Sequence, residues 1–514
     1  NSSIDENHNP MDLYKLQSQQ RQNDELDYAN FLETRNTFED NLKQSENSDK
    51  VNLNKRYITL APVANLLGIA FRLEDPDNLL GKSGVTVALV ERNHPGLIQN
   101  THHNPMNAGF PNGTIKGEFT IKLDQVIGGK DNIGNGWKML MECLAAGRGI
   151  CLPATAKASS NTSTLSMLQY AKHRKQFKIP LAKMEGIQEK LADMIYHTWI
   201  INTSIDLTNF YLDTGEKPSV LSAVMKQQTT ERARIVLNHA MDIHSGSAIC
   251  LGKNNILEKF YRAAPIGITV EGSNTLTRSL IIFGQGLNKS HPYIFDVIES
   301  ILKNDNNTFN TQFRHIFKHG VKCYIRSMNT FNNVSELEKQ TIEFANLSNF
   351  VALKGGALKS EQMLSGDMAD IFSNIYLAHS VKWHQDTFSV NEKISNYCID
   401  RLLEENKEKF NRVIHNLPFG NTILWFSKKK SSLSKYQIEK EVVEEALQCK
   451  NVYTMLAKDI DTTYNPINEL LNLDYVDNNT YQDLYNNVIQ VGEYENKAFN
   501  KKDQTEYSEP FMYM

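Results

Sequence analysis

The sequence lacks the usual marks of a metal-binding, nucleic-acid-binding or membrane-spanning protein. Its six cysteines are scattered and form no Cys-x-x-Cys pair, so we expect reduced thiols and no metal site. A net charge of −4 leaves no basic surplus for nucleic acid. The most apolar early run, residues 57–71, is interrupted by Pro62, Asn65 and Gly68 and falls short of the ~18 apolar residues that a membrane span needs. No signal peptide is visible, and we expect a cytoplasmic protein.

The remaining composition is that of a large globular chain with one unusual end. Hydrophobic residues make up 40% of the 514 residues and charged residues 22%. At about 150 residues per domain, the length of the chain predicts three or four domains. Residues 1–50 carry 11 acidic and 5 basic side chains and few apolar groups. We expect this acidic segment to be disordered or loosely helical.

Residues 51–135 have the pattern of a small β domain. Short runs rich in β-branched residues, at positions 57–60, 84–90 and 114–121, are separated by turn residues. A cluster of four glycines at residues 128–136 then precedes a helix that begins near Trp137. Because the cluster fits neither the dinucleotide-binding nor the Walker glycine pattern, we interpret it as a flexible turn.

The rest of the chain has helical periodicity. Apolar residues recur at helical spacing in residues 136–287, and breaks marked by glycine and proline predict an antiparallel four-helix bundle. Residues 288–514 are again mainly helical and contain no chemical motif that we recognise. The predicted fold is therefore mainly α with a small β domain, and with a helical C-terminal extension.

Two segments could carry chemistry. Residues 269–278 (TVEGSNTLTR) place Glu271 before a glycine at the start of a helix, where it could act as a catalytic carboxylate or merely oppose the helix dipole. Residues 172–177 (KHRKQF) place cations at the end of a helix, either as a surface cap or with Arg174 as a phosphate contact. The residues alone leave both alternatives open. In each case the structural role, at the helix dipole or as a surface cap, is the commoner one.

The order of these segments resembles the flavin-dependent acyl-CoA dehydrogenases. Residues 174–177 (RKQF), 184–188 (MEGIQ) and 270–274 (VEGSN) resemble motifs of that family's C-terminal bundle, and residues 55–62 (KRYITLAP) resemble its middle β domain. The nearest resemblance is to the long bacterial fatty-acid-degradation type with an extra C-terminal helical region, supported by residues 147–153 (GRGICLP), 240–243 (AMDI), 264–266 (API) and 282–286 (IFGQG).

The resemblance implies a function and roles for individual residues. The function is FAD-dependent α,β-dehydrogenation of fatty acyl-CoA to trans-2-enoyl-CoA in fatty acid β-oxidation, with a hydride passing to flavin N5. Glu271 would be the general base that removes the α-proton, and Arg148 and Gly272 would lie on the substrate side. The residues implied in FAD binding are Tyr57, Ile58 and Thr59 beside the flavin ring, and Arg174, Gln176 and Phe177 at the pyrophosphate and adenine end.

The resemblance also implies partners. These are fatty acyl-CoA, an electron-transferring flavoprotein as acceptor, and further copies of the chain in a homodimer or higher homo-oligomer. The charge balance argues against a nucleic-acid partner, and the resemblance leaves open a peripheral contact with the inner membrane.

Departures from the family pattern support an alternative. Residues 242–246 (DIHSG) replace a glutamine- and glycine-containing motif of many relatives, and Gln176 stands where many relatives have Thr or Ser. The family places an N-terminal helical domain and a flavin-cradling β segment before residue 55, so we expect a fragment or a chain that depends on a second polypeptide. The alternative function is a truncated, flavin-free helical protein with a structural or interaction role.

Overall fold

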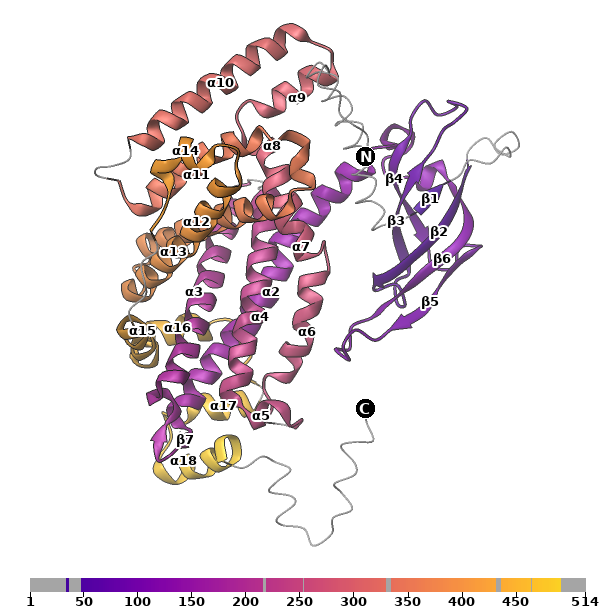
Figure 1. Ribbon diagram of the computed structural model, residues 1–514. Helices are drawn as coiled ribbons and strands as arrows, with labels where there is room; N and C mark the ends of the chain where they lie inside the picture. Colours follow the sequence, from indigo (N-terminus) through magenta and orange to yellow (C-terminus); the bar gives the residue numbers. More distant parts are fainter. Residues whose placement is uncertain are drawn as a thin grey trace. The chain divides into compact units, whose positions relative to one another are not determined.

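The computed structural model describes residues 34–36, 48–215, 219–252, 254–329, 334–430, 436–463 and 465–490 (Figure 1). The chain divides into two compact units. The first contains Asn1–Ala146 and Tyr293–Arg314, and the second contains Gly147–Pro292 and His315–Met514. Most of the acidic segment 1–50 lies outside the described residues, but its residues Thr34–Asn36 and the start of the strand Ser48–Thr59 are extended.

The first unit is built on one six-stranded sheet. Its strands have the order β4-β3-β1-β2-β6-β5, and their bounds are β1 Thr34–Asn36, β2 Ser48–Thr59, β3 Leu66–Leu73, β4 Gly84–Glu91, β5 Leu97–His103 and β6 Asn112–Lys122. All described pairings are antiparallel except that of β1 with β3. Alternate residues of β2 and β3, such as Val51, Leu53, Leu67 and Ile69, are buried in one apolar core, as expected for strands with one face covered.

Short helical turns and the helix α9 complete the first unit. They are η3 (Leu123–Gln125), η4 (Lys130–Asn132) and α9 (Ile294–Leu302). The glycine cluster of residues 128–136 forms turns that lead into the helix α2, which begins at Gly136 and continues into the second unit.

The second unit contains a bundle of long helices: α2 (Gly136–His173), α3 (Glu185–Asp213), α4 (Ser219–His244) and α6 (Glu258–Thr269) (Figure 1). The interface between α2 and α3 is polar although it is buried. Asn161 and Asn202 exchange amide hydrogen bonds of 3.2 and 2.6 Å, and the hydroxyls of Thr164 and Thr198 lie 2.8 Å apart. Buried polar groups are tolerated here because they satisfy one another. Short elements connect the helices: β7 (Lys175–Gln176), β8 (Ile179–Pro180), η5 (Leu181–Lys183), α5 (Gly246–Ile249), α7 (Asn274–Leu276), η6 (Thr277–Gln285) and α8 (Gly286–Ser290).

The part of the C-terminal extension that belongs to the second unit packs on this bundle, with α12 (Gln362–Phe388) in contact with α3 and η6. The other long helices of the extension are α10 (Asn306–Met328), which begins in the first unit, α11 (Glu336–Ala352) and α13 (Glu392–Asn416), which also contacts α12. Side-chain caps explain two of the helix starts. Ser335 and Glu338 form a capping box before α11, and Asn391 accepts a hydrogen bond from the Ile394 amide at the start of α13. The later elements are η7 (Gly355–Lys359), α14 (Gly420–Ile423), η8 (Trp425–Ser427), α15 (Tyr436–Gln448), α16 (Lys450–Ala457), α17 (Asn465–Asn472), α18 (Asn478–Tyr485) and η9 (Asn486–Gln490).

These elements confirm the predicted class, mainly α with a small β domain. Within the described residues, no helix is both long and apolar enough to cross a membrane. The division at residues 50, 135 and 287 remains a prediction.

Candidate active site

Glu271 lies in the second unit, in a sharp turn between α6 and α7 (Figure 1). Its φ of 55° is in the left-handed region, and Gly272 follows with a φ of 91°. Such a backbone costs a non-glycine residue about 1–2 kcal/mol and persists only where the surroundings hold it. The turn directs the chain out of α6 and back into a new helix, which places Glu271 at the junction.

The Glu271 carboxylate is half-buried and only partly satisfied. Among the described residues no group hydrogen-bonds its buried Oε2 atom. Burial raises the pKa of Glu271, and the nearby charges of Arg148 and Lys226 oppose that rise. A carboxylate with an open acceptor and a raised pKa is the arrangement expected of a general base.

Room for this carboxylate comes from Gly147 in α2. A Cβ atom added at Gly147 would lie 3.0 Å from Glu271 Oε1 and 3.2 Å from Oε2. Any larger residue would therefore press on the carboxylate. The absence of a side chain at residue 147 is thus part of the geometry of the site.

Two buried cations hold the turn from opposite helices. Arg148, the residue after Gly147 in α2, donates from Nε to the main-chain oxygen of Glu271 at 2.9 Å. Lys226 in α4 donates from Nζ to the main-chain oxygen of Gly272 at 2.7 Å and to Oδ1 of Asn274 at 2.6 Å. The structure brings together Arg148, Glu271 and Gly272, three of the site residues predicted from the sequence.

Sequence reasoning missed Gly147, Lys226 and Asn274. The sequence contains one weak signal for Lys226. This lysine directly follows the apolar residues 223–225 and is the charged residue in a stretch, 219–230, that is otherwise uncharged. Gly147 and Asn274 lie in the segments 147–153 and 270–274 that carry the family resemblance, but neither segment indicates their contacts with Glu271 and Lys226.

Arg174, Gln176 and Phe177 lie elsewhere in the second unit, at the end of α2 and in the β7–β8 hairpin. Phe177 and Lys178 form its two-residue turn with φ values of 51° and 68°, as a type I′ turn requires. The Phe177 side chain is 90% exposed, and Gln176 is also exposed. Arg174 is partly buried and donates from Nη1 to the main-chain oxygen of Ile489 at 3.3 Å.

Tyr57, Ile58 and Thr59 belong to the first unit, where they end strand β2. An irregularity in the pairing with β6 falls between Lys55 and Ile58, and within it Tyr57 has a φ of 58° and is 64% exposed. The Tyr57 ring packs on His103, with ring centroids 5.1 Å apart. These three consecutive residues therefore lie in the first unit, whereas the Glu271 turn lies in the second.

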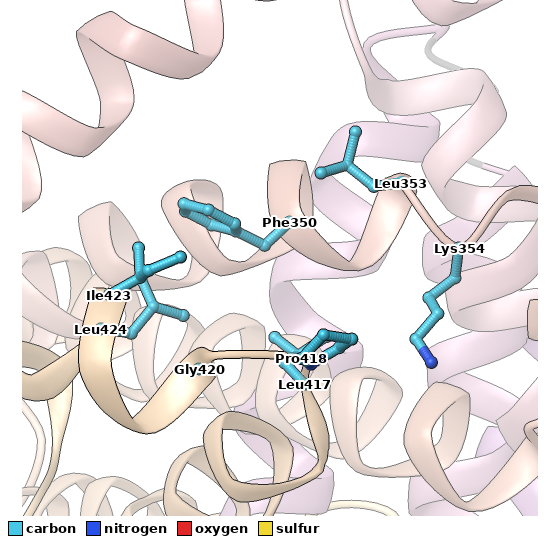
Figure 2. A pocket seen from close by; sticks show the side chains of 8 residues that line it. All are labelled: Phe350, Leu353, Lys354, Leu417, Pro418, Gly420, Ile423 and Leu424. Carbon is cyan, nitrogen blue, oxygen red and sulfur yellow. The ribbon is translucent and has the colours of Figure 1, made fainter.

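An apolar pocket in the C-terminal extension contains none of the predicted site residues. Its volume is about 190 Å³, and Phe350, Leu353, Leu417, Pro418, Ile423 and Leu424 line it together with Gly420 and Lys354. In Figure 2, Phe350 and Ile423 lie on one side and Lys354 on the other. The Lys354 ammonium pairs with Glu361 at 3.1 Å, and the other residues that line the pocket have no ionisable side chain.

Comparisons with known proteins identify the family. Residues 134–284 match the family model "Acyl-CoA dehydrogenase, C-terminal domain", and residues 288–465 match "Acyl-CoA dehydrogenase, C-terminal, bacterial type". Together the two matches cover more than half of the chain.

Individual relatives match over shorter stretches. A stretch of 101 residues is 37% identical to Protein HemX of Proteus mirabilis and covers 19% of this chain and 59% of that protein. A stretch of 241 residues is 29% identical to the acryloyl-CoA reductase (NADH) of Anaerotignum propionicum and covers 47% of this chain and 59% of the relative. The chain thus spans about three-fifths of the length of these curated relatives.

A solved structure shows the same fold. The acyl-CoA dehydrogenase from Bacillus anthracis, complexed with FAD, is 18% identical and has a TM-score of 0.64. The match covers 82% of this chain and 73% of that one. With the two family matches and this fold, the chain belongs to the acyl-CoA dehydrogenase family.

Proposed function

We propose that this chain takes part in the FAD-dependent α,β-dehydrogenation of fatty acyl-CoA thioesters to trans-2-enoyl-CoA, with Glu271 as the general base. The observation that carries the proposal is the Glu271 carboxylate itself, half-buried, with an open Oε2 acceptor and a raised pKa. Membership of the acyl-CoA dehydrogenase family supports oxidoreductase chemistry at this carboxylate.

Glu271 would remove the proton from the α-carbon of the thioester. The C–H bond breaks, the proton moves to a carboxylate oxygen, and the electron pair remains on the substrate. Burial favours this transfer, because a carboxylate whose pKa lies above its ordinary value has a higher affinity for the α-proton. Arg148 would fix the main chain of the base by its bond to the Glu271 carbonyl.

The residues implied in FAD binding fit a flavin dinucleotide by one shared feature. Tyr57 and Phe177 are aromatic, largely exposed and held with positive φ, so the fold keeps both rings out of the apolar cores in which aromatic side chains normally lie. Arg174 adds a cation three residues before Phe177 in the chain. In our proposal, Tyr57, Ile58 and Thr59 contact the ring, and Arg174, Gln176 and Phe177 contact the dinucleotide end. FAD, when bound, would supply the acceptor for the hydride from the β-carbon.

The family resemblance carries the rest of the proposal. We place the reaction in fatty acid β-oxidation in the cytoplasm, with an electron-transferring flavoprotein as acceptor and a homodimer or higher homo-oligomer as the assembly. One relative is named acryloyl-CoA reductase (NADH), and that name describes reduction of an enoyl-CoA, the reverse of dehydrogenation. We propose dehydrogenation because of the resemblance to the fatty-acid-degradation type.

Anaerobic spectroscopy on the purified full chain tests this proposal. After reconstitution with FAD, we expect a yellow protein whose flavin absorbance bleaches when fatty acyl-CoA of several chain lengths is added without oxygen. A chain that stays colourless after reconstitution would contradict the enzyme and favour the flavin-free structural or interaction protein. A yellow protein that bleaches with none of the acyl-CoA substrates would contradict the proposed reaction.

A further inference from the structure

Lys226 is a buried cation with a complete set of acceptors. The residue lies in α4, its exposed fraction is 0%, and its ammonium donates three hydrogen bonds. The acceptors are the main-chain oxygens of Ile268 at 3.2 Å and Gly272 at 2.7 Å, and Oδ1 of Asn274 at 2.6 Å. An ammonium has three N–H groups, so this geometry uses each of them once. All three acceptors belong to residues 268–274, the segment that contains Glu271.

Asn274 extends the connection along α4. Its side-chain amide donates to the Thr230 hydroxyl at 2.9 Å and to Glu231 Oε1 at 3.0 Å. Lys226 and Thr230 are four residues apart and so are neighbours on the surface of α4, and Glu231 directly follows Thr230. The segment after α6 is therefore attached to α4 over more than a full helical turn.

These bonds surround a strained backbone. Glu271 has a positive φ, and the hydrogen bonds from Lys226 reach the main chain before it at Ile268 and after it at Gly272. Burying a charged ammonium is costly unless it is paired or hydrogen-bonded, and here three hydrogen bonds to residues 268–274 offset that cost. The left-handed turn in turn needs surroundings that hold it.

We propose that Lys226 is a positioning residue that holds the Glu271 turn in its left-handed conformation and so fixes the place of the carboxylate. This inference rests on the proposed function of Glu271 as the base. Its physical content is a claim about the turn itself, which can be measured without substrate or flavin.

Hydrogen–deuterium exchange of the full chain tests the claim. In Lys226→Met, we expect the amides of residues 268–277 to exchange at least tenfold faster than in the wild type, while peptides from α12 and α13 keep their protection. The matched control is Thr229→Val in the same helix. Thr229 is equally buried, but its hydroxyl donates to Met225 of α4 itself and not to the turn. In this control, exchange of residues 268–277 should match the wild type.

A milder variant covers the case in which Lys226→Met does not fold. Lys226→Gln keeps two N–H donors on a shorter side chain, and we expect exchange of the turn between that of the wild type and that of Lys226→Met. Wild-type exchange of residues 268–277 in both variants would overturn the proposal. An equal increase over all helices would also overturn it, because Lys226 would then support the whole bundle and not the turn.

A pH profile separates positioning from a purely structural role. The charged groups that act on the Glu271 carboxylate are Arg148 from α2 and Lys226 from α4, and both favour its ionised form. Without the Lys226 ammonium, we expect the acidic limb of the bleaching rate to move to higher pH, with Thr229→Val unchanged. If Glu271→Gln bleaches like the wild type, the proposed function fails. If Glu271→Gln is inactive but Lys226→Met changes neither exchange nor pH profile, only the present inference fails.

Discussion

At the residue scale, the Glu271 carboxylate is subject to two opposed influences. Burial favours its neutral form, and the charges of Arg148 and Lys226 favour its ionised form, with burial the stronger of the two. A carboxyl with a raised pKa in the folded state stabilises the protein below its unfolded pKa, and this stabilisation is lost as the pH rises through the folded pKa. Ionisation of Glu271 therefore lowers the free energy of unfolding.

This balance predicts a gain in stability when the charge is removed. We expect Glu271→Gln to unfold at a higher temperature than the wild type at pH 7, and at the same temperature below about pH 4, where the carboxyl is protonated in both states. Thermal melts at the two pH values measure this. The control is Glu189→Gln, which changes an exposed carboxylate of α3. A Glu271→Gln protein that is less stable at pH 7 than at pH 4, relative to the wild type, would refute the sign.

Gly147 gives a second prediction at this scale. A methyl group at residue 147 would lie 3.0 Å from Glu271 Oε1 and should displace the carboxylate. We expect Gly147→Ala to bleach flavin about tenfold to a hundredfold more slowly, because small misplacements of reacting groups cost that much. Gly186→Ala is the control, since an added Cβ there meets nothing within 4 Å. Equal rates for the two variants would show that the carboxylate has room to move.

At the scale of elements, the C-terminal extension is joined to the segment that follows the Glu271 turn. Arg278 in η6 forms a two-pronged bond with Asp370 of α12, from Nε at 2.8 Å and from Nη2 at 2.7 Å. The same guanidinium lies 3.5 Å from Asp367. A bidentate pair of this kind fixes orientation as well as distance. Helix α12 of the extension is therefore bonded directly to η6, which follows the Glu271 turn.

Gly366 of α12 makes space for this pair. An added Cβ would lie 2.1 Å from Arg278 Nη1, so Gly366→Ala should displace the guanidinium and lower the free energy of unfolding by about 1–3 kcal/mol. The control is Gly320→Ala in α10, where an added Cβ meets nothing within 4 Å and should stabilise the helix by about 0.5–1 kcal/mol. Urea unfolding of the two variants should give changes of opposite sign. A stabilised Gly366→Ala protein would contradict the described packing.

The elements could be predicted from the sequence, but their contacts could not. Helical periodicity predicted helices in residues 136–287, where α3 and α4 lie, and in residues 288–514, where α12 lies, because the core residues of a helix repeat along one chain segment. The bonds of Lys226 to residues 268–274 and of Arg278 to Asp370 join positions more than 40 residues apart. Local patterns contain no information on such pairs. The positive φ of Glu271 likewise depends on these distant partners, and only the following glycine hinted at it.

At the scale of the whole molecule, the family is established and the reaction is our proposal. Family matches extend over residues 134–284 and 288–465, and they include the Glu271 turn and most of the extension. The residues of α2, α4 and α6 that hold the turn all belong to the second unit. Tyr57, Ile58 and Thr59 belong to the first unit, and Arg174, Gln176 and Phe177 belong to the second.

The rate of anaerobic flavin bleaching by acyl-CoA in Glu271→Gln, compared with the wild type at equal FAD content, tests the central claim most directly. Glutamine keeps the size of the side chain but cannot take up the α-proton, so our account predicts that the variant binds FAD like the wild type and does not bleach. Bleaching of Glu271→Gln at the wild-type rate would show that another group removes the proton and would contradict the account.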